Sequence, residues 1–264
     1  MWSRSSLATT PRRPRAMNLL HRINNVATRN TPVKLIRSRL GQPVASITFD
    51  DFPKSAWTEG RPILDRHGAK ATYYAAGRFC GQSEDGLDYY GPGDLTEIRD
   101  AGHEIGCHTF SHQYGTGVAS GDLEQDTDRN QAFIGERLGD YPLTSFAYPY
   151  GDVSPRTKFL FSRRFATSRG IRRGVNAGWI DLAQLKAIGL EHKAWNPAAI
   201  EQAVVEAVRR KGWIIFFTHD VSETPSPFGA TPGMLDHALA SVRKAGVDIL
   251  PVKHALARAA FQSA

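Results

Sequence analysis

Two adjacent carboxylates, Asp50 and Asp51, follow an apolar run in the stretch SITFDDFP at residues 46–53. Successive side chains of a strand point to opposite faces, so neighbouring acids reach one pocket only where the strand ends and the chain turns. At such a point, one carboxylate can bind a metal ion while the other acts as a general base. The alternative is that an Asp-Asp pair simply begins a turn.

The stretch HTFSH places His108 and His112 at positions i and i+4. Histidines at this spacing lie on one face of a helical turn and can bind one cation together, although two solvated histidines would explain the spacing equally well. With an aspartate from another strand end they would form a His₂Asp set. Such a set leaves positions on a zinc-like metal for water and substrate.

Two further stretches end in polar or aromatic residues. FAYPYG at residues 146–151 predicts a strand followed by a proline turn. Its functional interpretation is a rigid loop that offers a backbone N–H to a developing oxyanion and an aromatic wall to a sugar. Residues 213–220, WIIFFTHD, predict a buried strand that delivers His219 at its end. A single histidine in this position is more often structural than catalytic.

The elements that must position these residues are short apolar runs separated by amphipathic segments. Strands are predicted over residues 44–49, 71–75, 104–108, 145–148, 165–168, 187–190, 213–218 and 247–251. Strands alternating with helices indicate a parallel α/β architecture. An open, doubly wound sheet fits this pattern as well as a barrel does. A barrel is favoured because the chemical residues all follow the carboxyl ends of strands.

Several helix starts are visible in the sequence. Residues 94–97, DLTE, read as a capping box that begins a helix. Ser154, Asn196 and Thr231 each precede a proline, which is typical of an N-cap followed by the first helical residue. His103 is a lone histidine at the start of a strand, and a structural role is expected for it. Cys80 and Cys107 neither require nor exclude an oxidising compartment.

The charge is unevenly distributed along the 264 residues, whose formal net charge is +7. Residues 1–40 hold nine Arg or Lys and no acid, so the remainder holds 24 basic and 26 acidic residues, a net of −2. We therefore predict a basic, mostly disordered tail over residues 1–40, with Met17 as an alternative start, and one catalytic domain over residues 41–264. No nucleic-acid partner is expected.

The compartment is a separate expectation. The basic segment has no apolar core of the kind found in secretory signals, and the longest apolar stretch, residues 213–217, is too short to span a bilayer. A cytoplasmic location is therefore favoured.

Taken in order, TFDD, HTFSH, YPYG and FTHD resemble the polysaccharide deacetylase family (carbohydrate esterase family 4, the chitooligosaccharide deacetylase homology domain). The resemblance covers about residues 44–251. It implies a distorted, TIM-like (β/α)7–8 barrel, a divalent metal that is usually zinc, and hydrolysis of N-acetyl groups from amino sugars in a poly- or oligosaccharide. The expected partner is thus an N-acetylated carbohydrate.

The resemblance also implies roles for individual residues. Asp51, His108 and His112 would bind the metal, and Asp50 would be the base that activates the metal-bound water. The Tyr150 backbone N–H would help to hold the oxyanion, and His219 would protonate the leaving amine. The predicted substrate-binding residues are Tyr148, Pro149, Trp195 and Phe217, with Trp179 as an alternative wall for the acetyl group.

Two positions depart from the family pattern. Ala147 stands where the family usually has an arginine that tethers the base, and Ala194 stands where it has an aspartate that orients the acid histidine. Arg169, Arg172 or Arg173 is a candidate for the first function, and Glu191 or Asp181 for the second. The alternatives are a carbohydrate O-acetyl esterase, a cyclic-amide hydrolase, or a catalytically silent carbohydrate-binding protein.

Overall fold

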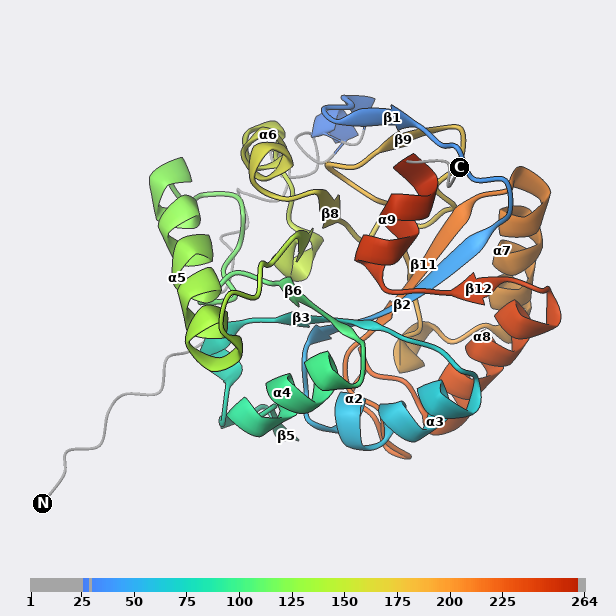
Figure 1. Cartoon of the computed structure of the whole chain (residues 1–264), viewed down its shortest axis with the longest axis horizontal. Coiled ribbons are helices and arrows are strands. Elements are labelled where there is room, and N and C mark those ends of the chain that lie inside the picture. The colour runs from blue at the N-terminus through green and yellow to red at the C-terminus, as the bar shows by residue number, and fades with distance from the viewer. Residues whose placement is uncertain (1–25, 29, 261–264) are drawn as a thin grey trace, which may run out of the picture.

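A curled sheet of eight parallel strands forms the centre of the computed structural model, which describes residues 26–28 and 30–260 (Figure 1). The strands are β10 (Ile188–Gly189), β11 (Trp213–Thr218), β2 (Val44–Asp51), β3 (Thr72–Ala75), β6 (Glu104–Cys107), β7 (Ser145–Ala147) and β8 (Thr167–Arg169), in this spatial order, with β12 (Asp248–Ile249) paired to β2. All eight strands predicted from the sequence are therefore confirmed. The order follows the chain from β2 to β8, as it does in a barrel.

The two edge strands, β8 and β10, are joined by an irregular segment. The Leu185 N–H donates to the Ser168 carbonyl (2.8 Å), and the Gly170 N–H donates to the Leu185 carbonyl (3.0 Å). An irregular segment thus closes the barrel at this point in place of a full strand. This is the distortion that was expected. The predicted fold class, a distorted (β/α) barrel, is confirmed.

Helices surround the sheet and explain why its strands are apolar on both faces. They are α2 (Ser55–Thr58), α3 (Gly60–Arg66), α4 (Pro92–Asp100), α5 (Ser120–Leu138), α6 (Pro155–Arg164), α7 (Pro197–Arg210), α8 (Pro232–Lys244) and α9 (Val252–Ala260). Short 3₁₀ turns η1 (Gly77–Phe79), η2 (Pro149–Gly151) and η3 (His192–Ala194) and a hairpin of β4 (Ser83–Glu84) and β5 (Leu87–Asp88) lie in the loops. No described helix is both long and apolar enough to span a membrane.

The observed N-caps agree with those predicted from the sequence, with one correction. Ser154, Asn196 and Thr231 cap α6, α7 and α8, and each side chain accepts a backbone N–H of the first turn. Asp94 is not an N-cap. It is the third residue of α4, and its carboxylate accepts the N–H of Gly91, which is the true N-cap (2.7 Å). The helix begins earlier because Pro92 fits its first turn.

Helix α9 lies across the amino ends of the strands (Figure 1). The Val252 N–H donates to Thr72 Oγ1 and the Lys253 N–H donates to Glu104 Oε2, both at 2.9 Å, and Thr72 and Glu104 begin β3 and β6. This end of the barrel is therefore covered. The carboxyl ends of the strands, which carry the candidate catalytic residues, form the opposite end.

Part of the predicted disordered tail is ordered. Residues 1–25 and 29 lie outside the described residues, but β1 (Leu35–Arg37) pairs antiparallel with β9 (Trp179–Asp181). The reason is the buried Lys158 ammonium, which lies 2.7 Å from Asp181 Oδ2 and donates to the carbonyls of Thr28 and Thr31. The domain therefore begins before residue 41.

His103 is buried and neutral, as a structural histidine should be. The Ala71 N–H donates to its Nδ1 (3.0 Å), and burial lowers its pKa to about 4. Its pKa in the unfolded chain is about 6.5, so between these values the unfolded state binds the extra proton and stability falls as the pH falls. We expect a loss of up to about 3 kcal/mol between pH 7 and pH 4.

The measurement is urea unfolding across this pH range for the wild type and His103→Asn, whose amide oxygen can still accept from Ala71. The variant should be less stable near neutrality but should lose less free energy on acidification. Parallel curves for the two proteins would contradict this assignment.

Candidate active site

Loops at the carboxyl ends of three strands bring together four of the predicted residues. Asp51 ends β2, His108 and His112 follow β6, and His219 follows β11. Asp51 Oδ1 lies 2.9 Å from His112 Nε2 and 3.3 Å from His108 Nε2, and Asp51 Oδ2 lies 3.9 Å from His219 Nε2. His219 is far from Asp51 in sequence. The two residues lie close together because β11 is adjacent to β2 in the sheet.

The backbone at this centre is left-handed at several non-glycine residues. The φ angles are 60° at Asp51, 59° at Thr109, 48° at His112 and 58° at Tyr150. Such angles are uncommon outside glycine, and they cluster at functional sites where the surrounding structure enforces them. The reversal at Asp51 is what lets both neighbouring carboxylates, Asp50 and Asp51, serve the same end of the barrel.

The tautomer of His108 is fixed by its surroundings. Its Nδ1 lies 2.8 Å from the carbonyl oxygen of Ala147. A carbonyl only accepts hydrogen bonds, so Nδ1 carries the proton and Nε2 presents a lone pair to Asp51. This is the arrangement by which metal-binding histidines are usually held.

The donor atoms fit a divalent cation. Asp51 Oδ1 is buried and has no hydrogen-bond donor among the described residues, although two imidazole nitrogens face it. A carboxylate oxygen and a lone-pair nitrogen repel each other at 3.3 Å unless a proton or a cation lies between them. Asp51, His108 and His112 could therefore hold a metal, and two imidazoles with one carboxylate form a set that suits zinc.

The charge state of Asp51 agrees with this interpretation. Burial raises the pKa of its carboxyl, but the neighbouring imidazoles of His112 and His108 lower it by more. Together they hold the pKa well below its ordinary value. The carboxylate is thus ionised, as a metal ligand must be.

Helix α5 holds the loop that carries both histidines. The Asp126 carboxylate accepts the N–H groups of Phe110 and Ser111, both at 3.0 Å, and the Ser111 hydroxyl at 2.7 Å. One turn later, Asn130 donates to the Ala75 carbonyl and accepts the Gly77 N–H. The two ligand histidines are therefore positioned by a helix that carries none of the predicted site residues.

Of the three arginine candidates, Arg169 is the one that contacts Asp50. Its guanidinium forms a fully buried ion pair with Asp50, Nη2 to Oδ1. Ala147 and Arg169 are register partners on the paired strands β7 and β8. The positive charge has therefore moved to the neighbouring position in the sheet. The other two candidates, Arg172 and Arg173, are exposed side chains.

Neither carboxylate proposed for the second tether contacts His219. Glu191 Oε2 lies 3.6 Å from Lys193 Nζ, and Asp181 pairs with Lys158 on another part of the barrel. The His219 Nδ1 lies instead 3.3 Å from the carbonyl oxygen of Phe228. The expectation of a replacement Glu191 or Asp181 is therefore wrong, because the loop after β11 places a peptide group there.

The predicted substrate-binding residues of the YPYG loop need correction. Tyr148 is buried and its hydroxyl donates to the Ala183 carbonyl (2.9 Å), and Pro149 is buried as well. Phe217 is only 6% exposed and lies with its ring 5.0 Å from the Arg169 guanidinium carbon. These side chains support the site from below and offer almost no surface to a sugar.

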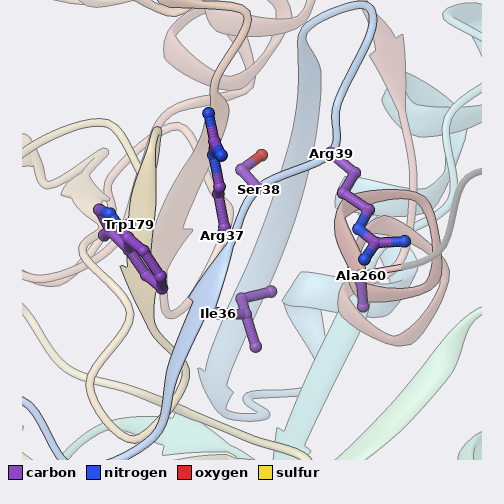
Figure 2. Close-up of a pocket in the computed structure, with 6 residues that line it drawn as sticks. All are labelled: Ile36, Arg37, Ser38, Arg39, Trp179 and Ala260. Atoms are coloured by element: carbon purple, nitrogen blue, oxygen red, sulfur yellow. The ribbon is translucent and has the colours of Figure 1, made fainter.

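The two candidate tryptophans lie away from the metal ligands. The Trp195 ring packs edge-on against His237, in a cavity of about 630 Å³ between α7 and α8. Trp179 is 68% exposed and lines a cavity of about 650 Å³ with Arg37, Arg39 and Ala260, at the end of the barrel covered by α9 (Figure 2). The structure thus does not support either indole as a wall for the acetyl group.

An aromatic wall does border the metal ligands, but other residues form it. Tyr150 is 45% exposed, and its ring centroid lies 4.5 Å from that of His112 and 4.1 Å from that of Tyr114, on which it stacks. Phe79 lies on another side of His112 and stacks on Tyr89. Tyr114 could have been found from its position two residues after the HTFSH stretch. Phe79 and Tyr89 had no comparable signal.

About half of the sequence is similar to known proteins. Residues 37–164 match the family described as polysaccharide deacetylase. A peptidoglycan-N-acetylglucosamine deacetylase of Listeria monocytogenes is 29% identical over 110 residues, 41% of this chain and 22% of that protein. Chitin deacetylase 2 of Cryptococcus neoformans var. grubii is 32% identical over 112 residues, 42% of this chain and 23% of that protein. The chain thus spans less than a quarter of either relative.

Solved structures show the same fold. A family 4 acetyl xylan esterase from Clostridium thermocellum, in complex with a cobalt ion, superposes with a TM-score of 0.57 at 23% identity, over 81% of this chain and 90% of that chain. A peptidoglycan N-acetylglucosamine deacetylase superposes with a TM-score of 0.58 at 17% identity, over 87% of this chain and 92% of that chain.

The fold and the site together define a distorted (β/α) barrel with a candidate metal centre at the carboxyl ends of its strands. The sequence match agrees with them: residues 37–164 match the polysaccharide deacetylase family, and the relatives named above are deacetylases. The resemblance identified in the sequence is confirmed.

Proposed function

We propose that this chain hydrolyses the N-acetyl groups of amino sugars in a poly- or oligosaccharide. The observation that carries the proposal is the convergence of Asp51, His108 and His112 between the buried Asp50–Arg169 pair and the His219 imidazole. The named relatives, which are peptidoglycan and chitin deacetylases, support the same reaction. A silent binding protein would have no need of the Asp50–Arg169 pair.

Asp51, His108 and His112 would hold a divalent cation, for which we propose zinc. Bound there, the cation would polarise the amide carbonyl and lower the pKa of water. His108 is prepared for this task by its Nδ1 hydrogen bond to Ala147. Asp51 contributes the negative charge that favours the divalent ion.

Asp50 is the proposed general base. It would take a proton from water as the water oxygen bonds to the carbonyl carbon. Arg169 holds the Asp50 carboxylate in place, because its buried guanidinium pairs with Asp50 Oδ1. The Tyr150 N–H is proposed to donate to the oxygen that gains negative charge.

His219 is the proposed general acid. As the carbon–nitrogen bond breaks, its Nε2 would donate a proton to the leaving nitrogen, because an amine anion is too basic to leave unprotonated. Its Nε2 faces Asp51 and its ring is partly accessible, as a donor to a bound substrate must be. The exposed ring of Tyr150 and the half-buried ring of Tyr114 would pack against the sugar. A cytoplasmic location stays a prediction, and finding the mature protein outside the cell would contradict it.

The test is acetate release from N-acetylglucosamine oligomers by purified protein. We expect release to stop when a chelator removes the metal and to return when zinc is added, because the reaction would lose the cation that polarises the amide carbonyl and activates water. Metal content measured on the same samples serves as the control. Bound metal without acetate release would overturn the proposed substrate, and a metal-free protein that still releases acetate would overturn the site.

A further inference from the structure

We propose that the peptide carbonyl of Phe228 orients His219 for proton donation, and that Asp220, Ser226 and Gly229 are the positioning residues that hold this carbonyl in place. The inference rests on the proposed function in one respect, the role of His219 as the proton donor. It assigns a task to a loop of residues 220–230 that carries none of the predicted site residues. It also explains how the chain manages with alanine at position 194.

The two ring nitrogens of His219 face different partners. Nδ1 lies 3.3 Å from the Phe228 carbonyl oxygen, and Nε2 lies 3.9 Å from Asp51 Oδ2. Because a carbonyl can only accept, Nδ1 must donate and Nε2 is the nitrogen turned toward the reaction. The Thr218 hydroxyl donates to the same carbonyl oxygen at 3.3 Å, which fixes the acceptor from a second direction.

A buried carboxylate shapes the loop that supplies the carbonyl. Asp220 is 1% exposed, and its two oxygens accept the N–H (2.8 Å) and the hydroxyl (2.6 Å) of Ser226. The Ser226 hydroxyl oxygen in turn accepts the N–H groups of Phe228 (3.3 Å) and Gly229 (3.1 Å). The Phe228 peptide is thus held on both sides by one serine, and the serine by one aspartate.

Glycine is required beside this clamp. A Cβ at Gly229 would lie 2.3 Å from Asp220 Oδ1, a distance that real atoms do not tolerate. Pro225 and Pro227 flank Ser226 and restrict its backbone further. The loop is therefore built to a single conformation.

The segment that lacks the family carboxylate now anchors this loop. The His192 N–H donates to the Gly229 carbonyl (2.7 Å), and the Lys193 N–H donates to the Pro227 carbonyl (3.2 Å). The Lys193 ammonium also lies 3.5 Å from the centroid of the Phe228 ring. The turn η3, which ends at Ala194, thus holds the loop of residues 220–230 through backbone hydrogen bonds. It does not contact His219 through an acidic side chain.

The test reads the His219 tautomer directly in zinc-loaded, ¹⁵N-labelled full-length protein. Ring nitrogen spectra are recorded at about pH 8, where an ordinary histidine is neutral, and His219 is assigned by its absence in His219→Gln. We expect a protonated Nδ1 with slow hydrogen exchange. It should persist in Ser226→Thr and in Ser222→Ala, a matched control in the same loop. Ser226→Ala and Gly229→Ala should lose it. A protonated Nε2 in the wild type, or an unchanged Nδ1–H in both disrupted variants, would overturn the proposal.

Activity measurements on two substrates distinguish a loss of His219 orientation from general damage to the active site. Ser226→Ala should lower kcat for the N-acetyl substrate by about 10- to 100-fold, within the range of one lost proton transfer, with KM and bound zinc unchanged. Hydrolysis of an aryl acetate, whose phenolate leaves without a proton, should change less than about threefold. Equal losses on both substrates would contradict the proposal. If the wild type releases no acetate, the proposed function fails, yet the tautomer measurement still decides the carbonyl's role.

Discussion

Replacing Arg169 with methionine is expected to lower kcat for deacetylation by about 100- to 1,000-fold, close to the level of an Asp50→Ala variant, because general bases contribute within this range. The guanidinium is the charged partner of Asp50 at the bottom of the site. Without it, the buried Asp50 carboxylate loses its charged partner and its fixed orientation, so it is no longer held where it can accept a proton from water. Initial rates of acetate release, with bound zinc measured in parallel, check this expectation.

The sheet register provides a sharp control for this prediction. Ala147 and Arg169 are paired across β7 and β8, and neighbouring strands are about 4.8 Å apart. An arginine introduced at Ala147 in the Arg169→Ala background should therefore reach Asp50 and recover at least about tenfold of the lost rate. The same Ala147→Arg change beside the native Arg169 should be harmful, because position 147 is fully buried and two guanidiniums would compete for one carboxylate.

Loss of stability alone would give a different pattern. Breaking a buried ion pair costs about 3–5 kcal/mol, so urea unfolding must show that the variants are folded in the assay. If Arg169→Met is folded, binds zinc and keeps more than about a tenth of the wild-type kcat, Asp50 is not held by Arg169 for catalysis.

The sequence was sufficient for the strands and for the three candidate metal ligands. Each predicted strand was a run of mostly apolar residues. Such runs are expected in a barrel, because both faces of its strands are buried. Asp51, His108 and His112 were identified as candidates from short motifs, but residues 108–112 form a loop and not the helical turn that the spacing predicted. The positions that sequence reasoning assigned to the family motifs are the ones that the structure brings together.

The groups that contact Asp50 and His219 in place of the absent arginine and aspartate were much harder to predict from the sequence. Arg169 was one of three candidates, and only the register of β7 against β8 selects it. The Phe228 carbonyl could not have been found at all, because a peptide group has no identity in the sequence. Its position depends on hydrogen bonds between Asp220 and Ser226, six residues apart in a loop. Phe79 and Tyr89 were missed as well, because Phe79 contacts His112 only through the fold and Tyr89 stacks on Phe79 from another loop.

The ordered segment around β1 shows a further limit. Composition predicted disorder there, because basic residues without acids do not usually form a core. The acid that stabilises this segment, Asp181, lies far along the chain. It accepts the N–H groups of Val33 and Lys34 while it pairs with Lys158. A charge count over neighbouring residues cannot detect such a partner.

Asp126→Ala is expected to weaken zinc binding by about 10- to 100-fold, the usual effect of losing a group that supports metal ligands from outside the coordination sphere. The Asp126 carboxylate accepts three hydrogen bonds from Phe110 and Ser111, which lie between the two ligand histidines. Without these bonds, the strained backbone at Thr109 and His112 has less to hold it. Competition titration against a chromophoric chelator measures the affinity.

Two matched variants on α5 separate this role from a general effect on the helix. Asp126→Asn keeps an oxygen that can accept the Phe110 and Ser111 N–H groups and adds an amide that can donate to the Ser111 hydroxyl, so its zinc affinity should stay within about threefold of the wild type. Asp122→Asn makes the same chemical change at an exposed position in the first turn and should have no effect on zinc. Excess zinc should restore acetate release in Asp126→Ala, because Asp50, Arg169 and His219 are untouched. An Asp126→Ala protein with normal zinc affinity but low activity would show that the loop positions the substrate, rather than the metal.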